Sequence, residues 1–393
     1  MTTAAQAAAL ALGDPGRPQS LAHGATGMTL PRIEAALAGN EPWDAVHQLL
    51  AIAAAAKVLA GPQASLYEGA PALGFALHAA AAARPGWYRG ALGQVDAAVV
   101  GLTRRRLDEA HTRIDRQQRP ALGEYDLFYG LTGLGVYALR HYPRRPELGA
   151  ILSYLVRLTE PLIVDDLRLP GWWTHQAPTP DGGDRYAAGH GNIGMAHGIT
   201  GPLALLALAH LQGHTVHGHA DAIWRICRWL DRWRQDEHPE SPWWPRTITL
   251  AEERSHRTRQ DGPAQPSWCY GTPGVARAQQ LAALATGEKT RRRIAETALL
   301  RCVSDLDQLA QIRDSGLCHG AAGLYQTVWR AAADAESPRL AAQLPHLAEL
   351  LGSYQPGEDP GFLTGEAGRA LAARTASTCR APATGWDACL LLH

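Results

Sequence analysis

The chain of 393 residues has no net charge, because 37 Lys and Arg residues balance 37 Asp and Glu residues. It therefore lacks the overall positive charge that nucleic acids or anionic membrane surfaces attract. It also lacks an uncharged apolar run near the ~18 residues of a membrane-spanning helix, since Lys57 interrupts the Ala-rich run at 48–60. With 46% hydrophobic residues, the composition predicts a folded protein with a sizeable core, no nucleic-acid partner and no integral membrane segment.

The N-terminus lacks the basic residues that precede the apolar segment of a secretory signal. The first basic residue is Arg17, which follows the apolar stretch instead of preceding it. We therefore expect a soluble, cytoplasmic protein. We also expect a single domain over residues 1–393, with residues 1–25 as a flexible N-terminus.

Cysteine is absent from the first 226 residues. All six cysteines lie in the C-terminal part of the chain, at Cys227, Cys269, Cys302, Cys318, Cys379 and Cys389. A long chain expected in a reducing compartment does not suggest a disulfide framework. No close C-x-x-C pair is present either. Clustered cysteines in such a chain indicate a metal site, a catalytic thiol or packing in the core.

A short glycine motif recurs along the chain. It has the form Gly-x-x-Gly and occurs as YGLTGLG (129–135), AHGITG (196–201), CYGTPG (269–274), CHGAAG (318–323) and LTGEAG (363–368). A related segment, YEGAPALG (67–74), has Gly69 followed by Ala72 at the equivalent place. Because the same neighbours recur at each site, we interpret the motif as an internal repeat.

The segments between the motifs are helical in pattern. Apolar residues recur at three- and four-residue spacing, as in 202–211 and 291–310. No alternating β-branched run is long enough to predict a main sheet. We therefore expect an all-α fold of six or seven helix pairs, in which Gly-x-x-Gly opens the second helix of each pair. Such pairs either stack as a solenoid or close into a ring, and a ring would gather the motifs at one mouth.

Two long insertions interrupt the helical pattern, at 165–195 and 236–268. Each carries a Trp pair and leads directly into a motif, so we expect both insertions near the mouth. The Trp pairs either line a substrate groove or, the interpretation we favour, pack against helix ends.

Two further clusters have simpler interpretations. At 210–219, four histidines have ligand-like spacing: His210, His214, His217 and His219. We interpret them as polar residues at a helix end, not as a second metal site. We expect Trp224, Trp229 and Trp233 to pack on one helix face.

Cysteine and histidine gather at two of the motifs. Cys269 precedes one motif, and the adjacent Cys318 and His319 precede another. Two thiolates and one imidazole form a known zinc ligand set, and three protein ligands leave the fourth position open, as in catalytic zinc sites. A structural zinc would need a fourth protein ligand, for which Cys302 or His197 is the candidate.

The motifs resemble the signatures of the lanthionine synthetase C-like (LanC-like) family. The resemblance rests on YDLFYGLTG (125–133), AHGITG, WCYGTPG (268–274) and CHGAAG, and it continues to the terminal GWDACLLL (385–392). It implies an α/α toroid, one catalytic zinc ion per chain and a lanthipeptide cyclase, an enzyme that closes thioether rings in ribosomally made peptides.

Carried over residue by residue, the resemblance assigns roles to six positions. Its zinc ligands fall on Cys269, Cys318 and His319. The histidine of the family's AHG motif corresponds to His197, and the acidic residue of its YD motif corresponds to Asp126. The tyrosine that follows the family's first ligand cysteine corresponds to Tyr270. The family often has an arginine four residues before that first cysteine, where this chain has Gln265. A nearby arginine such as Arg259 would have to replace it, or the substrate is held differently.

The implied reaction gives these residues a chemical use. Zinc would convert a peptide cysteine to its thiolate, which adds to dehydroalanine or dehydrobutyrine and leaves an enolate that needs a proton. His197 is the candidate general acid, and Asp126 would orient or support it.

The resemblance also implies partners. The substrate would be a dehydrated precursor peptide, supplied by a separate dehydratase, within a membrane-associated synthetase complex that includes an export protein. Two alternatives remain open: an enzyme that adds a small thiol such as glutathione to a modified residue, and a non-catalytic peptide-binding scaffold with structural zinc.

Overall fold

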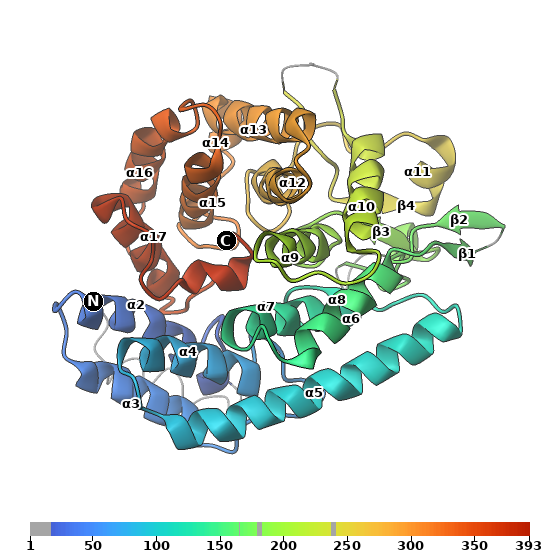
Figure 1. Ribbon diagram of the computed structural model, residues 1–393. Helices are drawn as coiled ribbons and strands as arrows, with labels where there is room; N and C mark the ends of the chain where they lie inside the picture. Colours follow the sequence, from blue (N-terminus) through green and yellow to red (C-terminus); the bar gives the residue numbers. More distant parts are fainter. Residues whose placement is uncertain (1–16, 165, 179–182, 237–240) are drawn as a thin grey trace.

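The glycine motifs open the helices of an inner ring (Figure 1). In the computed structural model, which describes residues 17–164, 166–178, 183–236 and 241–393, a helix begins at or just after each motif's first glycine. These helices are α4 (Ala70–Ala83), α7 (Leu131–His141), α9 (Thr200–Leu211), α12 (Thr272–Thr286), α15 (Ala321–Asp334) and α17 (Glu366–Thr378). The predicted all-α fold is confirmed.

A further copy of the motif lies at the N-terminus. Gly24 and Gly27 in AHGATG (22–27) open helix α2 (Ala25–Leu37), which completes the inner ring. The prediction of flexibility is therefore wrong for residues 17–25. There, Leu21 is fully buried and its backbone N–H donates to Tyr67 O at 2.9 Å. Residues 1–16 lie outside the described residues.

An outer helix follows each inner helix except α17 and packs against it. The outer helices are α3 (Trp43–Ala54), α5 (Arg89–Asp115), α8 (Pro146–Leu158), α10 (His219–Trp233), α13 (Lys289–Ser304) and α16 (Leu344–Ser353). The motif thus opens the first helix of each pair. The prediction that it opens the second helix is therefore wrong. The reason is that the close approach that glycine permits is needed in the crowded inner ring.

Short elements fill the connections. They are η1 (Arg17–Gln19), α6 (Leu122–Tyr125), η2 (Gly183–Tyr186), α11 (Leu250–Ser255), α14 (Leu306–Leu309), η3 (Ala341–Gln343) and η4 (Trp386–Leu390). Strands β1 (Leu162–Val164) and β2 (Leu167–Leu169) form one antiparallel pair, and β3 (His190–Asn192) and β4 (Thr247–Thr249) form another. The second pair ties the two insertions together.

Backbone hydrogen bonds join consecutive motifs and close the ring. They run from Leu21 N to Tyr67 O, Leu127 N to Ala196 O, Met195 N to Cys269 O, Cys269 N to Cys318 O, Leu317 N to Leu363 O and Phe362 N to Ala22 O, at 2.8–3.2 Å. Between the second and third motifs, the stacked rings of Tyr67 and Phe128 make the connection, with centroids 4.2 Å apart. Because the last motif bonds to the first, the fold is an α/α toroid and not an open solenoid.

The second glycine of a motif lies against a carbonyl of the same motif. A Cβ on Gly323 would come within 1.8 Å of Leu317 O, and one on Gly274 would come within 2.0 Å of Trp268 O. No side chain fits in that space, since real Cβ contacts do not fall below about 3 Å.

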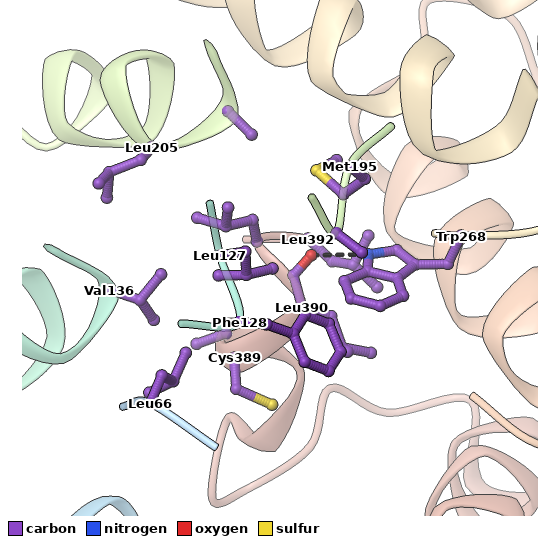
Figure 2. Close-up of a cluster of buried hydrophobic side chains, with 14 of the residues drawn as sticks. Leu66, Leu127, Phe128, Val136, Met195, Leu205, Trp268, Cys389, Leu390 and Leu392 are labelled. Carbon is purple, nitrogen blue, oxygen red and sulfur yellow. Dashed lines mark hydrogen bonds between the residues drawn. The ribbon is translucent and has the colours of Figure 1, made fainter. Parts of the chain in front are cut away.

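The C-terminal tail enters the centre of the ring (Figures 1 and 2). Its carbonyls accept hydrogen bonds from inner-ring side chains: Tyr67 Oη binds Cys389 O and Trp268 Nε1 binds Leu390 O, both at 2.8 Å. Asp387, which is fully buried, receives Arg330 Nε at 2.6 Å. The tail therefore completes the apolar core and links distant repeats through polar contacts.

The tryptophans follow the predicted packing with one exception. Both insertion pairs, Trp172–Trp173 and Trp243–Trp244, are buried. Trp229 and Trp233 are also buried, but the prediction is wrong for Trp224, which is 54% exposed and lies under the guanidinium of Arg228. In the part of the chain that the structure describes, no helix has the length and apolarity to cross a membrane.

Filling the glycine contact should destabilise the fold. We expect Gly323→Ala to lower the free energy of unfolding by about 2 kcal/mol or more, because the new methyl group displaces the Leu317 carbonyl. The control is Gly149→Ala inside α8, where a Cβ meets nothing within 4 Å. It should stabilise by about 0.5–1 kcal/mol. Urea unfolding followed by circular dichroism measures both, and equal stability of the two variants would contradict the close-packing argument.

The tail contact gives a second prediction. Burial alone raises the pKa of the Asp387 carboxyl, but the hydrogen bond from Arg330 contributes to holding it below its usual range. Its stabilisation is therefore complete above the unfolded pKa of ~3.9 and is lost as pH falls through the lower folded value. At neutral pH, Asp387→Asn should cost about 3 kcal/mol in thermal or urea unfolding, because Arg330 loses its buried partner. The exposed pair of Asp236 with Arg234 supplies the control: Asp236→Asn should change stability by less than ~0.5 kcal/mol, and an equal loss would refute the prediction.

Candidate functional site

One residue from each motif lies at the same mouth of the ring, since all inner helices begin there. These are the residues immediately before the first glycines: His23, Glu68, Tyr129, His197, Tyr270, His319 and Thr364. The ring thus gathers side chains that are far apart in the sequence.

Cys269, Cys318 and His319 form a compact group of potential metal ligands. Their ligand atoms all lie within 4.8 Å of one another, about twice a zinc–sulfur bond length of ~2.3 Å. The hydrogen bond from Cys269 N to Cys318 O, at 3.2 Å, holds the two motifs together at this point. Cys269 is buried and His319 is exposed, so the group has one face toward the mouth. These residues fit a single metal ion.

The contacts within the group favour a thiolate. The Cys318 thiol, followed by His319, lowers the pKa of Cys269 well below its usual range despite burial. The contact with Cys269 in turn raises the pKa of the His319 imidazole. A thiolate with a second thiol and an imidazole beside it is a donor set that suits zinc.

Asp314 and Gln265 hold His319 from outside the group. Nε2 of His319 lies 3.4 Å from Asp314 Oδ2, and Asp314 Oδ1 accepts from Gly316 N at 2.8 Å. With Nε2 directed to Asp314, Nδ1 is the atom left for an ion. Gln265 Nε2 donates to His319 O at 2.8 Å, so this position contacts the backbone of a ligand residue.

Sequence reasoning missed Asp314 and its counterpart Asn192, although the sequence holds a signal for both. Each lies six residues before a motif's first glycine and accepts a hydrogen bond from the glycine N–H two residues on, Gly316 or Gly194. Asp359 repeats this pattern before the last motif. The spacing Asx-x-Gly marks these turns.

No fourth protein ligand joins the group among the described residues. Cys302, one candidate, is buried elsewhere and its Sγ lies 3.3 Å from Gln308 Oε1. His197, the other, is bound to Asp126. The described residues contain no second cluster of this kind either. His219 is buried, with Nε2 donating to Leu206 O at 2.8 Å, which agrees with a structural role for that histidine-rich segment.

His197 and Asp126 form a close pair. Nδ1 of His197 lies 2.6 Å from Oδ2 of Asp126, which is fully buried. The other oxygen, Oδ1, accepts from the backbone N–H groups of Tyr129 and Gly130 at 2.7 and 2.9 Å. Asp126 therefore both caps the turn before α7 and fixes the imidazole. The fixed ring leaves Nε2 as the free nitrogen of a side chain that is 29% exposed.

Aromatic rings surround His197. Its ring centroid lies 4.8 Å from that of Phe128, 5.9 Å from Tyr129 and 6.3 Å from Tyr270. Burial raises the pKa of Tyr270, so its phenol stays protonated, and Asn192 Nδ2 donates to its oxygen at 3.0 Å. Tyr129 is 52% exposed and forms an open wall of the site. Its contact with His197 follows from the ring, since the two residues belong to neighbouring repeats.

A cavity of about 800 Å³ opens beside the metal group. Tyr270 and Gln265 form the side nearest the group, and residues of both long insertions form the rest together with Gln311 and Arg313. The insertions therefore lie near the mouth, as predicted. Arg259 also lines this cavity.

Comparisons with known proteins agree with this geometry. A sequence profile described as "Lanthionine synthetase C-like protein" matches residues 16–391. The nisin biosynthesis protein NisC of Lactococcus lactis subsp. lactis is 24% identical over 147 residues, which are 36% of this chain and 34% of that protein. The alignment thus spans about a third of that relative's length. The solved structure of a nisin cyclase has a TM-score of 0.83 at 20% identity, covering 99% of this chain and 95% of its own, which shows the same fold. Because the family profile matches nearly the whole chain, this protein belongs to the lanthionine synthetase C-like family.

Proposed function

We propose that this protein is a zinc-dependent lanthipeptide cyclase. The observation that carries the proposal is the Cys269–Cys318–His319 group at the same mouth as the His197–Asp126 pair. The names of the related nisin proteins support it. The substrate would be a precursor peptide in which Ser and Thr have been dehydrated, and the product a lanthionine or methyllanthionine ring.

The reaction is an addition without a redox change. A peptide cysteine loses its thiol proton, its sulfur bonds to the β-carbon of dehydroalanine or dehydrobutyrine, and the carbon–carbon double bond is lost. The electron pair moves to an enolate, which takes a proton at the α-carbon. The site must therefore supply a thiolate at one place and a proton at another.

Cys269, Cys318 and His319 would hold one zinc ion and leave a position open to the peptide thiol. Zinc bound there lowers the pKa of a thiol and keeps the sulfur as a nucleophilic thiolate. Three described protein donors instead of four favour this catalytic arrangement over the scaffold with structural zinc. Asp314 would fix the orientation of the His319 ring.

His197 would deliver the proton to the α-carbon through Nε2. The backbone N–H of Ala196, the preceding residue, points to Cys269 O at 3.3 Å, which places His197 beside the metal group. Asp126 would act as a positioning residue, because both its oxygens are engaged and it is fully buried. Tyr270, as a protonated phenol, would help to position the substrate carbonyl on the same side.

The proposed substrate implies other proteins. A dehydratase must act first, because the reaction begins from dehydrated residues. We propose a cytoplasmic enzyme that works with this dehydratase, in a membrane-associated complex that also includes an export protein. Copurification from the native host tests this assembly, and repeated absence of a dehydratase would count against it.

Metal content tests the zinc site. Purified wild-type protein should contain about one zinc ion per chain, and Cys318→Ala should lose it, because two donors hold zinc poorly. Cys302→Ala is the control, since this buried cysteine lies outside the group. Elemental analysis gives the metal content and circular dichroism the helix content. Wild-type protein that is fully helical and takes up no added zinc would refute the site.

The acid role is tested by a matched pair of histidine variants. His197→Ala should reduce ring formation by about 10²–10⁴-fold with unchanged zinc content. His23→Ala is the control, because His23 has the same place in the AHGATG motif but forms no ion pair with a carboxylate of the described residues. Mass spectrometry after blocking of free thiols counts the rings formed.

The same assay separates the alternatives. Rings within the peptide support cyclisation, whereas adducts with added glutathione in place of rings support addition of a small thiol. Full ring formation by His197→Ala would overturn the assignment of the acid.

A further inference from the structure

The cavity beside Tyr270 carries a concentration of positive charge. Four arginines line it: Arg185, Arg246, Arg259 and Arg313. No Asp or Glu is among its described lining residues. The chain as a whole has zero net charge, so this local excess is not a consequence of a basic composition.

Three of these guanidinium groups have no partner within the described part of the chain. The side chains of Arg246, Arg259 and Arg313 are exposed, and none forms a hydrogen bond or an ion pair with a described residue. By contrast, Arg185 lies 4.0 Å from Glu252. Clustered like charges repel one another, and an anionic ligand would relieve that repulsion.

The backbone around the arginines is firmly held. Gln260 Oε1 accepts from Arg246 N at 3.0 Å, which joins two walls of the cavity. Glu252, which is buried, accepts from Arg259 N at 2.7 Å and completes a capping box with Thr249. The carboxylate of Glu252 is therefore used by backbone and hydroxyl groups and does not neutralise the Arg259 side chain. These hydrogen bonds hold the backbone of the cavity, whereas the guanidinium groups of Arg246, Arg259 and Arg313 have no partner among the described residues.

We propose that this cavity binds a carboxylate-bearing segment of the peptide substrate, outside the residues that form the ring. Guanidinium groups bind carboxylates through paired hydrogen bonds, and the lining side chain of Gln311 can bind a peptide amide. The cavity meets the metal group at Gln265, whose amide donates to His319 O. One peptide can thus place acidic residues in the cavity and a cysteine at the mouth. This inference rests on the proposed function and specifies the substrate further.

A binding measurement separates this site from the chemistry. The probe is a fluorescein-labelled peptide with three Asp residues in a Gly, Ala and Leu background, without Cys, Ser or Thr, so that it cannot cyclise. Its partner has Asn in place of each Asp. Binding to the full-length zinc-loaded protein is measured by fluorescence anisotropy. At low salt the Asp peptide should bind at least tenfold more tightly than the Asn peptide, and at high salt the difference in affinity between the two peptides should be smaller.

Two triple variants with the same charge change locate the binding. The first triple variant combines Arg246→Gln, Arg259→Gln and Arg313→Gln. It should bind the Asp peptide about tenfold more weakly than wild type does. The control combines Arg116→Gln, Arg228→Gln and Arg339→Gln, three exposed arginines that do not line the cavity, and should stay within about twofold of wild type. Equal binding of the Asp and Asn peptides, or equal losses in the two triple variants, would overturn the proposal.

A cyclisation assay on a dehydrated peptide without acidic residues keeps the two proposals distinguishable. If the cavity triple variant cyclises this peptide like wild type but binds the Asp peptide more weakly, the cavity serves recognition as proposed. If wild type cyclises it and binds the Asp and Asn peptides equally, the inference fails while the proposed function stands. If wild type forms no ring yet shows arginine-dependent binding, the proposed function fails and the carboxylate site alone remains.

Discussion

The hydrogen bonds between neighbouring Gly-x-x-Gly motifs are the contacts on which the other features depend. They hold the inner helices at one level. The turns that carry them need glycine, because a Cβ on Gly274 or Gly323 would meet a carbonyl of its own motif. The ring in turn creates a centre, which the C-terminal tail fills with apolar side chains and hydrogen-bonded carbonyls. The packing of the inner helices, the closure of the ring and the gathering of motif residues at one mouth therefore all depend on these hydrogen bonds.

The same backbone contacts bring the residues of the candidate site together. Cys269 and Cys318 belong to different repeats, yet a main-chain hydrogen bond connects them directly. His197 lies in the next repeat, and its partner Asp126 in the one beyond. Four consecutive repeats thus contribute to one site, and each side chain stands on a rigid turn and not on a long loop. The adjoining cavity is built differently, mainly from the two insertions together with Gln311 and Arg313.

The glycine repeat predicted the helical fold well because spacing and composition are local properties. The first copy, AHGATG, was missed because an Ala-rich N-terminus looks flexible until the packing of Leu21 against the second repeat is known. Trp224 was misplaced because it lies on the part of α10 that stays exposed, which is decided by how α10 packs against α8 and α9. Asp314 and Asn192 were missed although their Asx-x-Gly spacing is visible in the chain.

The kinds of reactive groups are visible in the sequence: two cysteines and a histidine at motif positions, and a second histidine in an AHG motif. The closure of the chain into a ring is known only from the fold, because it depends on a contact between residues 22 and 362, at opposite ends of the chain. The fold also shows that Asp126 is buried against His197, that Cys302 lies away from the metal group, and that unpaired arginines of the second insertion line one cavity together with Arg313. Such contacts join residues far apart in sequence, and local spacing carries no information about which distant groups will meet.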